Sequence, residues 1–358
     1  MHPALTTPLL DLLGSKYPIV QTGMGWVAGP KLVSATSNAG AFGIIASATM
    51  TYDELVVAIA ETKKRTTAPF GVNMRADADD IMDRLKLLVA EGIPVASFAQ
   101  APKKDLIEYL HDHGIKVMPS IGAKRHAEKV MEWGVDAILV QGGEGGGHTG
   151  SVPTSLLLPE VVDVVGGRVP VVAAGGYFDG RGLVSALAYG ACGIAMGTRF
   201  LLTSDSSVPM EVKKQYLGTA VTGTVVTTKV DGAPHRVIRT KLVDQMDGAS
   251  PITAVPKAIA NAARFRKFTG LSWYQMAKEG LDMKKRMDMP WAEVIMAGNT
   301  PILTKATLVD GELDAGILPT GQVVGVIDDL PTAAEVVTRI IAEAETTLDR
   351  LAGRSPGS

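Results

Sequence analysis

The chain of 358 residues lacks the features that mark secreted, membrane-bound and nucleic-acid-binding proteins. Cys192 is its single cysteine, which excludes an intrachain disulfide and fits a reducing compartment. It has no run of about 18 apolar residues and no basic N-terminal segment leading into an apolar one, so we expect neither a membrane span nor an export signal. The formal net charge of −2 gives no basic excess for nucleic acid or anionic membranes. We therefore expect a cytoplasmic protein, with Cys192 as a small buried side chain rather than a reactive thiol.

Aromatic residues are also scarce, at 5%, whereas the chain has 39 glycines and 46% hydrophobic residues. The hydrophobic share is that of a globular protein with ample material for a core. Glycine permits tight turns and lets the backbone approach a ligand closely. The composition therefore favours a fold with many strand-to-helix turns around a ligand.

Short apolar runs alternate with amphipathic stretches up to about Thr198, which is typical of repeated βα units around a parallel sheet. The expected strands are Ile19–Gln21, Phe42–Ala46, Phe70–Asn73, Val95–Phe98, Lys116–Ser120, Ala137–Gln141, Val169–Ala174 and Gly193–Thr198. The expected helices include Leu32–Asn38, Tyr52–Lys64, Ala78–Glu91, Lys103–His113, Ala123–Trp133 and Gly182–Tyr189. Glycines after four of these helices (Gly92, Gly114, Gly134 and Gly190) predict left-handed helix ends.

Eight strands of this kind predict an α/β fold, the (β/α)8 TIM barrel. A doubly wound open sheet is the competing arrangement, and it would hold its ligand at a single switch point. Here nearly every expected strand ends in glycine or polar residues, so ligand-facing turns recur around the whole sheet. This recurrence favours the closed barrel.

The remainder of the chain does not continue the alternation. Its patterns predict a hairpin, two helices, a glycine-rich segment and a final amphipathic helix. The hairpin is Val225–Val237, and the two helical patterns are Ile259–Lys267 and Trp273–Met287. The glycine-rich segment is Gly311–Gly325, and the final helix is Thr332–Leu351. We therefore expect a barrel at 1–205 with C-terminal closing segments, a mostly helical appendage near the barrel mouth at about 206–330, and a terminal helix and tail at 331–358. The appendage could serve as a lid or as a contact in a homodimer.

The strongest local signal is Gln141-Gly-Gly-Glu-Gly-Gly-Gly-His148-Thr-Gly150, directly after an expected strand. Such glycine density lets backbone N–H groups reach a planar or anionic ligand. The spacing of Gly145–Gly150 matches a dinucleotide fingerprint, which also needs a helix opening there and an acidic residue about 20 positions on. Pro153 follows instead, and the residues near Val165 are apolar or glycine, so we reject that reading.

His148 ends this loop, where a barrel carries its active site. An imidazole has a pKa near the working pH and can move a proton to or from carbon. The other five histidines lack a comparable setting, and no pair shows metal-ligand spacing, so we expect His148 to be catalytic and no metal to be bound.

Two late turns, Ala173-Ala-Gly-Gly176 and Met196-Gly-Thr198, follow the seventh and eighth expected strands. In (β/α)8 enzymes these two positions commonly hold a phosphate through backbone N–H groups. Together they predict a phosphate site. Near the chain's start, Gln21-Thr-Gly-Met-Gly25 and Asn73 offer a glycine turn and amides for the heteroatoms of a ring system.

In combination these motifs resemble the FMN-dependent nitronate monooxygenases, formerly called 2-nitropropane dioxygenases, a group that includes the flavin-type bacterial enoyl-ACP reductases. The matching segments follow one another along nearly the whole chain. They are Gln21–Gly25, Gly71–Asn73, Gln141–Gly150, Ala174–Gly176, Met196–Thr198, Thr224–Thr227 and Gly321–Gly325.

The resemblance implies FMN, with its phosphate in the two late turns and with His148 as the catalytic acid/base. The cofactor-binding residues expected from it are Gln21, Thr22, Gly23, Met24, Asn73, Gln141, Gly146, Gly147, Ala174, Gly175, Gly176, Met196, Gly197 and Thr198.

Three segments, Val20–Ala28, Gln141–Gly150 and Phe178–Gly182, are similar to an actinobacterial branch of the family that degrades the last two steroid rings as coenzyme A thioesters. That similarity implies an NAD(H)-coupled enzyme acting at the α,β carbon–carbon bond of an acyl-CoA. The substrate would be a hydroxylated methyl-indane-carboxyl-CoA from cholesterol ring degradation. Oxidation of alkyl nitronates with O2, reduction of an enoyl-ACP, and non-catalytic binding of a phosphorylated ligand are the alternatives.

Overall fold

A computed structural model describes residues 1–247, 301 and 303–354. Eight parallel strands form a closed barrel, in the order β1-β2-β3-β4-β5-β6-β8-β9. They are β1 (Ile19–Gln21), β2 (Phe42–Ala46), β3 (Phe70–Met74), β4 (Val95–Phe98), β5 (Lys116–Ile121), β6 (Ile138–Gln141), β8 (Val171–Ala174) and β9 (Gly193–Met196). The barrel closes where β1 pairs with β9, with Val20 opposite Ala195. The expected (β/α)8 barrel is therefore confirmed, and the open sheet is excluded.

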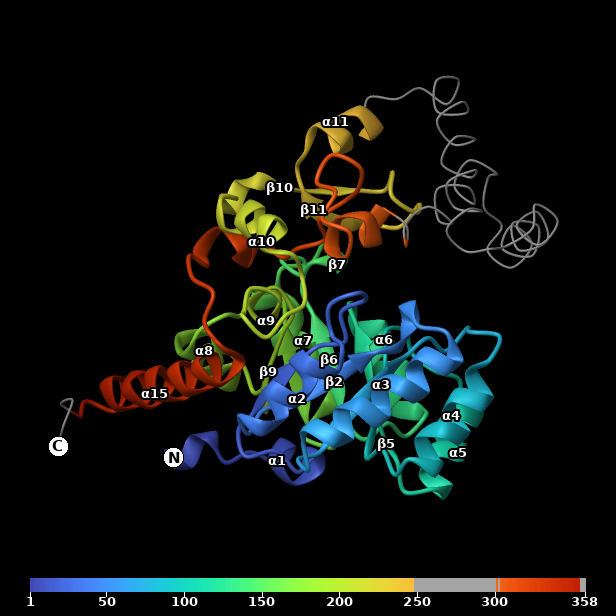
Figure 1. The fold of residues 1–358 in the computed structure, drawn as a ribbon. Helices are drawn as coiled ribbons and strands as arrows, with labels where there is room; N and C mark the ends of the chain where they lie inside the picture. Colours follow the sequence, from blue (N-terminus) through green and yellow to red (C-terminus); the bar gives the residue numbers. More distant parts are fainter. Residues whose placement is uncertain (248–300, 302, 355–358) are drawn as a thin grey trace.

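Helices surround the barrel in Figure 1. They are α2 (Pro30–Asn38), α3 (Tyr52–Arg65), α4 (Ile81–Ala90), α5 (Lys104–Asp112), α6 (Lys124–Glu132), α7 (Thr154–Val165) and α8 (Gly180–Ala188). The four glycines expected to end helices all have positive φ, from 60° at Gly92 to 90° at Gly190. Helix α7 is not among the expected helices because Pro159 interrupts its pattern. The eighth strand ends at Met196, two residues before its expected end, because Thr198 begins a short helix, α9 (Thr198–Leu201).

The core has two layers, one inside the barrel and one between the barrel and its helices. The inner layer comes from alternate strand residues such as Val20, Val95 and Val172. Leu9 and Leu13 of α1 (Pro8–Leu13), which follows the 3-10 turn η1 (Pro3–Leu5), close this layer at the amino ends of the strands. An active site is therefore expected at the other end of the barrel, where the strands have their carboxyl ends.

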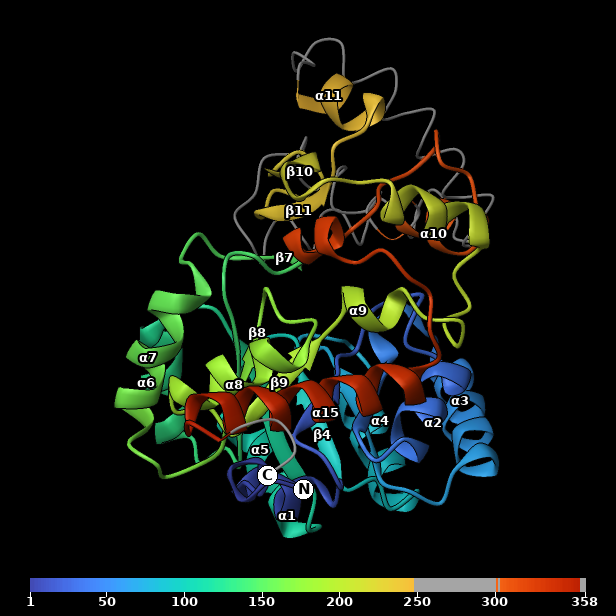
Figure 2. The same cartoon turned by 90° about the vertical axis from the view of Figure 1, so that its left-hand side faces the viewer.

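The rest of the described chain forms an appendage above the carboxyl ends of the strands, as both views show (Figures 1 and 2). It contains α10 (Met210–Leu217), β10 (Thr224–Thr227), β11 (His235–Ile238) and α11 (Lys241–Asp247), together with the 3-10 turns η3 (Val221–Gly223) and η4 (Gln322–Val326). Strands β10 and β11 form the expected hairpin. The expected helices at Ile259–Lys267 and Trp273–Met287 lie outside the described residues. Among the described residues, no helix is both long and apolar enough to cross a membrane.

The last helix, α15 (Ala333–Leu351), returns to the barrel and lies beside α8 and α2 (Figure 2). The Thr332 side chain and Glu335 form a capping box at its start, as the sequence S/T-x-x-E requires. Its Glu343 carboxylate accepts a 2.8 Å hydrogen bond from the Gly180 N–H. A Cβ at Gly180 would lie 2.4 Å from the backbone of Ala344, so only glycine permits this helix contact.

Replacement of Gly180 by alanine should therefore lower the free energy of unfolding by about 1–3 kcal/mol through overpacking. The control is Gly218→Ala, because a Cβ there would meet nothing closer than the Lys214 carbonyl oxygen at 3.4 Å. The control should change stability by less than about 0.5 kcal/mol. Chemical denaturation of the two variants and the parent measures both values, and equal stability of the two variants would contradict the packing argument.

Candidate active site

The residues that the sequence singles out lie in turns at the carboxyl ends of five barrel strands. Gln21 ends β1, Asn73 lies in β3, Gln141 ends β6, Ala174 ends β8 and Met196 ends β9. Because all eight strands are parallel, these ends share one face, the face covered by the appendage (Figure 1). The fold therefore brings the candidate residues to one mouth of the barrel.

The turn after β1 packs against the turn after β9. The Thr22 N–H donates to the Met196 carbonyl oxygen at 3.2 Å. The Thr22 hydroxyl and the Met24 sulfur would each lie 3.3 Å from a Cβ placed on Gly197. Gly197 therefore keeps two turns, distant in sequence, in direct contact.

Gln21 and Asn73 are buried amide side chains beside this contact. Gln21 donates from Nε2 to the Ile44 carbonyl oxygen at 3.2 Å, whereas its Oε1 is buried and accepts no hydrogen bond from the described residues. Asn73 donates from Nδ2 to the Ser97 hydroxyl at 3.3 Å. A Cβ on Gly23 would lie 2.5 Å from the Asn73 Cβ, so this turn lies directly on the amide.

The turn after β8 uses two glycines in the left-handed region, Gly175 with φ 94° and Gly176 with φ 85°. A Cβ at Gly175 would lie 3.0 Å from the Gly142 carbonyl oxygen. Glycine is therefore required there both by the positive φ and by this close approach. Within the described residues, the N–H groups of Gly176, Gly197 and Thr198 donate to no protein acceptor. This pair of turns therefore presents free backbone donors at the mouth.

A segment from the far end of the chain braces these turns. The Gly321 N–H donates to the Thr198 hydroxyl at 3.0 Å, and the Gln322 N–H donates to the Glu144 carbonyl oxygen at 3.0 Å. A Cβ on Gly146 would lie 2.4 Å from the carbonyl carbon of Thr320. The glycine-rich loop and the late turns are thus joined through Thr320–Gln322.

The loop that carries His148 forms a two-residue strand, β7 (Gly147–His148), which pairs antiparallel with β11. His148 lies opposite His235, and Gly147 lies opposite Arg236. From within the barrel, the Gln141 Nε2 donates to the His148 carbonyl oxygen at 2.7 Å. The backbone of His148 is therefore held from both the barrel and the appendage.

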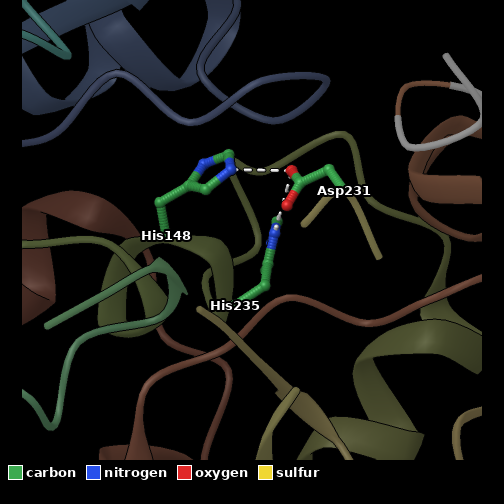
Figure 3. Close-up of side chains that lie close together, drawn as sticks. All are labelled: His148, Asp231 and His235. Atoms are coloured by element: carbon green, nitrogen blue, oxygen red, sulfur yellow. Dashed lines mark hydrogen bonds and ion pairs between the residues drawn. The ribbon is translucent and has the colours of Figure 1, made fainter. Parts of the chain in front are cut away.

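Three side chains meet at this pairing, as Figure 3 shows. The His148 Nε2 lies 2.7 Å from the Asp231 Oδ2, and the His235 Nδ1 lies 3.7 Å from the same oxygen. The two imidazole rings are 4.6 Å apart between centroids and tilted by 47°. His148 is 65% exposed, whereas the side chains of His235 and Asp231 are 6% and 10% exposed. The exposed histidine thus rests on a buried carboxylate and a buried histidine.

This contact changes the acidity of both partners. The hydrogen bond to Asp231 raises the pKa of His148 above its ordinary value, and partial burial of the ring opposes it less strongly. Burial alone would raise the pKa of Asp231, but the two imidazoles outweigh it and hold that pKa well below its usual range. Asp231 therefore stays ionised, and His148 is a stronger base than a free histidine.

Sequence reasoning misses Asp231 and His235. From the sequence pattern His235 has no setting comparable to that of His148, and its position beside His148 corrects this expectation. The two residues follow His148 by more than eighty positions, and no short motif contains all three. They are brought together by the β7–β11 pairing. This pairing cannot be predicted from the sequence pattern, because β7 is only two residues long and lies inside a glycine-rich loop.

Cys192 is half-buried rather than fully buried as expected. Burial raises the pKa of its thiol, which disfavours the reactive thiolate.

The chain is similar to known proteins over almost its full length. The family model described as nitronate monooxygenase matches residues 6–343. A (3aS,4S,5R,7aS)-5-hydroxy-7a-methyl-1-oxo-octahydro-1H-indene-4-carboxyl-CoA dehydrogenase of Mycobacterium tuberculosis is 57% identical, over 96% of this chain and 97% of the relative. The dehydrogenase of the same name from Rhodococcus jostii is 55% identical, over 97% of this chain and 98% of the relative. A probable nitronate monooxygenase of Staphylococcus saprophyticus is 30% identical, over 73% of this chain and 87% of the relative.

Solved structures agree with these relatives. FabK from Thermotoga maritima superposes with a TM-score of 0.78 at 32% identity, over 97% of this chain and 98% of that chain. A nitroalkane oxidase from Streptomyces ansochromogenes superposes with a TM-score of 0.76 at 26% identity, over 96% of this chain and 99% of that chain. The resemblance inferred from the turn motifs is thereby confirmed: the chain is an oxidoreductase and belongs to the nitronate monooxygenase family.

Proposed function

We propose that this protein is an FMN-dependent, NAD(H)-coupled oxidoreductase that acts at the α,β carbon–carbon bond of an acyl-CoA. The proposed substrate is a hydroxylated methyl-indane-carboxyl-CoA from steroid ring degradation. The observation that carries the proposal is the position of His148, a basic and exposed imidazole at the same barrel mouth as the late-turn N–H donors that are unpaired among the described residues. The identity of 57% to a dehydrogenase of such a CoA ester, along nearly the whole chain, supports the substrate class.

The hydrogen-bonding groups of the barrel mouth fit FMN. The N–H groups of Gly176, Gly197 and Thr198, which have no acceptor in the described part of the chain, match the oxygens of a phosphate. The buried Gln21 Oε1, unpaired within the described residues, is an acceptor for a ring N–H. Flavin enzymes among the family and its structural neighbours support the same group.

In this assignment His148 removes the proton from the carbon next to the thioester, an acidic position because the carbonyl stabilises the resulting charge. FMN held at Gly176, Gly197 and Thr198 would supply the hydride acceptor for the neighbouring carbon, with NAD⁺ as the final acceptor of the electron pair. The developing enolate oxygen needs a hydrogen-bond donor. In the glycine-rich loop, the N–H groups of Gly142, Gly143 and Gly145 donate to protein carbonyls. The N–H of Gly146 has no protein acceptor in the described chain and is our candidate for that donor.

Positioning accounts for much of the expected rate. The Gln141 side chain and the β7–β11 pairing fix the backbone of His148, and the late turns would fix the cofactor on the same rigid barrel. Holding a base and a hydride acceptor at adjacent carbons removes the entropy cost of bringing them together. Run in reverse, the same arrangement reduces an enoyl thioester.

Oxidation of alkyl nitronates with O2 is the second candidate function. The family model and a relative named probable nitronate monooxygenase favour it. It would use the same histidine and the same cofactor site, but it would need neither a CoA ester nor a nicotinamide.

The phosphate assignment predicts that Gly176→Ala weakens FMN binding about tenfold. A side chain at φ 85° strains the turn and moves its N–H, which still exists in alanine, away from the phosphate, so that one good hydrogen bond is lost. Gly167→Ala is the matched control. It has a similar φ, 73° against 85°, but it lies in the turn between α7 and β8, at the opposite end of the barrel. Fluorescence titration of the flavin-free proteins with FMN measures both affinities. Equal losses in the two variants would assign the effect to backbone strain and remove the support for a phosphate at Gly176.

The base assignment predicts that His148→Gln lowers kcat about 10²- to 10⁴-fold, because the variant lacks the proton acceptor. The visible spectrum of the bound flavin should stay that of the parent, since none of the cofactor turns is altered. Steady-state kinetics with the CoA ester, together with the flavin content, test this. Turnover near the parental rate would remove His148 from the mechanism.

The redox partner is tested by mixing the purified protein anaerobically with NADH while the visible flavin band is followed. We expect rapid bleaching, and then reoxidation by an α,β-unsaturated CoA thioester of a steroid fragment. A yellow protein that NADH does not bleach, and that consumes oxygen with an alkyl nitronate, would favour the second candidate function.

A further inference from the structure

We propose that Asp231 is a positioning residue that fixes the tautomer of His148, so that Nδ1 of His148 is the atom that exchanges protons with substrate. We further propose that His235 forms the buried wall against which this pair is held. The inference rests on the catalytic role of His148 proposed above, and it adds two residues that the sequence motifs do not contain.

The orientation of the Asp231 carboxylate carries the first step. Its Oδ1 accepts a hydrogen bond from the Ala233 N–H at 3.2 Å, within the same tight turn. Its Oδ2 faces the His148 Nε2 at 2.7 Å. The turn therefore aims one oxygen at the histidine before any substrate is present.

The tautomer follows from the chemistry of the two groups. Asp231 stays ionised, so both of its oxygens are acceptors and the partner nitrogen must carry the proton. A neutral His148 then has Nε2–H toward Asp231 and a lone pair on Nδ1. In Figure 3 the Nδ1 edge of the ring points away from both Asp231 and His235. Nδ1 is thus the nitrogen available to a substrate.

The backbone hydrogen bonds around the pair restrict the position of His148. The Thr149 N–H donates to the Pro234 carbonyl oxygen at 3.0 Å, next to the ladder that joins His148 to His235. The loop and the hairpin therefore move as one unit. Because the 65% exposed ring is not held by packing alone, the carboxylate contact is what fixes its direction.

His235 supports the pair from the interior. Its side chain is 6% exposed, and neither of its ring nitrogens has a hydrogen-bond partner among the described residues. Its ring lies against the His148 ring, with the Nδ1 at 3.7 Å from the carboxylate, beyond hydrogen-bond distance. A buried ring in this position excludes water from one side of the Asp231–His148 bond.

The remaining charged groups nearby face elsewhere. Arg236, next to His235 on β11, donates to the Gly143 carbonyl oxygen at 2.8 Å and to the Thr224 hydroxyl at 3.0 Å. Glu144 in the glycine-rich loop accepts from the Thr154 N–H at 3.0 Å. In the described chain, Asp231 and His235 are therefore the titratable groups that directly face His148.

A metal ion on the same three side chains is the competing interpretation, because their ligand atoms lie within 4.8 Å of one another. Two ligands at zinc distances of about 2.0–2.1 Å on a tetrahedral ion are roughly 3.3 Å apart. The 2.7 Å separation of Nε2 and Oδ2 is shorter and matches a shared proton. The geometry therefore favours a hydrogen-bonded pair.

The decisive experiment is a pH titration, followed by ¹⁵N NMR, of the FMN-loaded full chain labelled with ¹⁵N-histidine. The sequence has only 6 histidines, so the spectrum contains few signals. The spectra of His148→Gln and His235→Phe assign the two relevant signals. We expect the neutral imidazole of His148 to carry its single ring proton on Nε2. Asp231→Asn should lower its pKa by about one unit, because an opposite charge is removed.

The same variant should change catalysis in a defined direction. A base works when unprotonated, so a lower pKa of His148 moves the acid limb of kcat/KM to lower pH by the same amount. Asp231→Asn should also lower kcat about tenfold or more, because part of the ring population then presents the wrong nitrogen. Flavin content should not change. Asp231→Glu, which keeps the charge, should restore the position of the acid limb at least in part.

The chain provides a matched control in a second histidine–carboxylate pair. The His111 Nε2 lies 2.8 Å from the Asp136 Oδ2, on α5 and the loop before β6, away from the mouth. Asp136→Asn should leave the acid limb and the His148 signal where they are. His235→Phe keeps a ring in the wall and should shift the limb less than Asp231→Asn does.

The outcomes separate this inference from the proposed function. If His148→Gln is inactive but Asp231→Asn leaves both the His148 titration and the acid limb unchanged, the positioning role is wrong and the base role stands. If His148→Gln is fully active, the proposed function fails first. Tight binding of Zn²⁺ to the parent that Asp231→Asn and His235→Phe both abolish would overturn the hydrogen-bonded pair in favour of a metal site.

Discussion

The pairing of β7 with β11 is the contact on which the rest of the site depends. It is only two residues long, yet it joins a loop of the barrel to a hairpin of the appendage. Without it, His148 would end a glycine-rich loop with no fixed direction, and Asp231 would lack its hydrogen-bond partner. The pairing works because glycines let the loop turn sharply; Gly147 itself has φ 68°. A flexible sequence is thus held in one shape by a partner strand rather than by its own propensity.

A second link of the same kind lies next to this pairing, because the Thr320 N–H donates to the Arg236 carbonyl oxygen of β11 at 3.3 Å. Thr320–Gln322, from near the C-terminus, hydrogen-bonds to Thr198 and to the backbone of Glu144. The turns assigned to phosphate and the loop that carries the histidine therefore share one support. The appendage thus supplies the second half of the site's framework, and the barrel supplies the first.

The sequence predicts most of the barrel but only part of the site. The strands were predictable because buried parallel strands are continuous apolar runs, and the late turns were predictable because Gly175 and Gly176 must adopt positive φ. Asp231 and His235 were not predictable, since their role depends on a contact between segments more than eighty residues apart in the sequence. Thr320 was missed for the same reason. Periodicity describes what a segment does locally and carries no information on which distant segment it meets.

The position of α15 has a consequence for how the molecule is made and varied. It lies beside α8 and α2, where the eighth outer helix of a barrel belongs, although it is the last described helix of the chain. The whole appendage is therefore an insertion between the eighth strand and its helix. During synthesis on the ribosome, the seam between α8 and α2 stays uncovered until the final residues emerge. Over evolutionary time, the inserted segment can change in length and sequence to suit a new substrate, while the barrel and its closing helix stay the same.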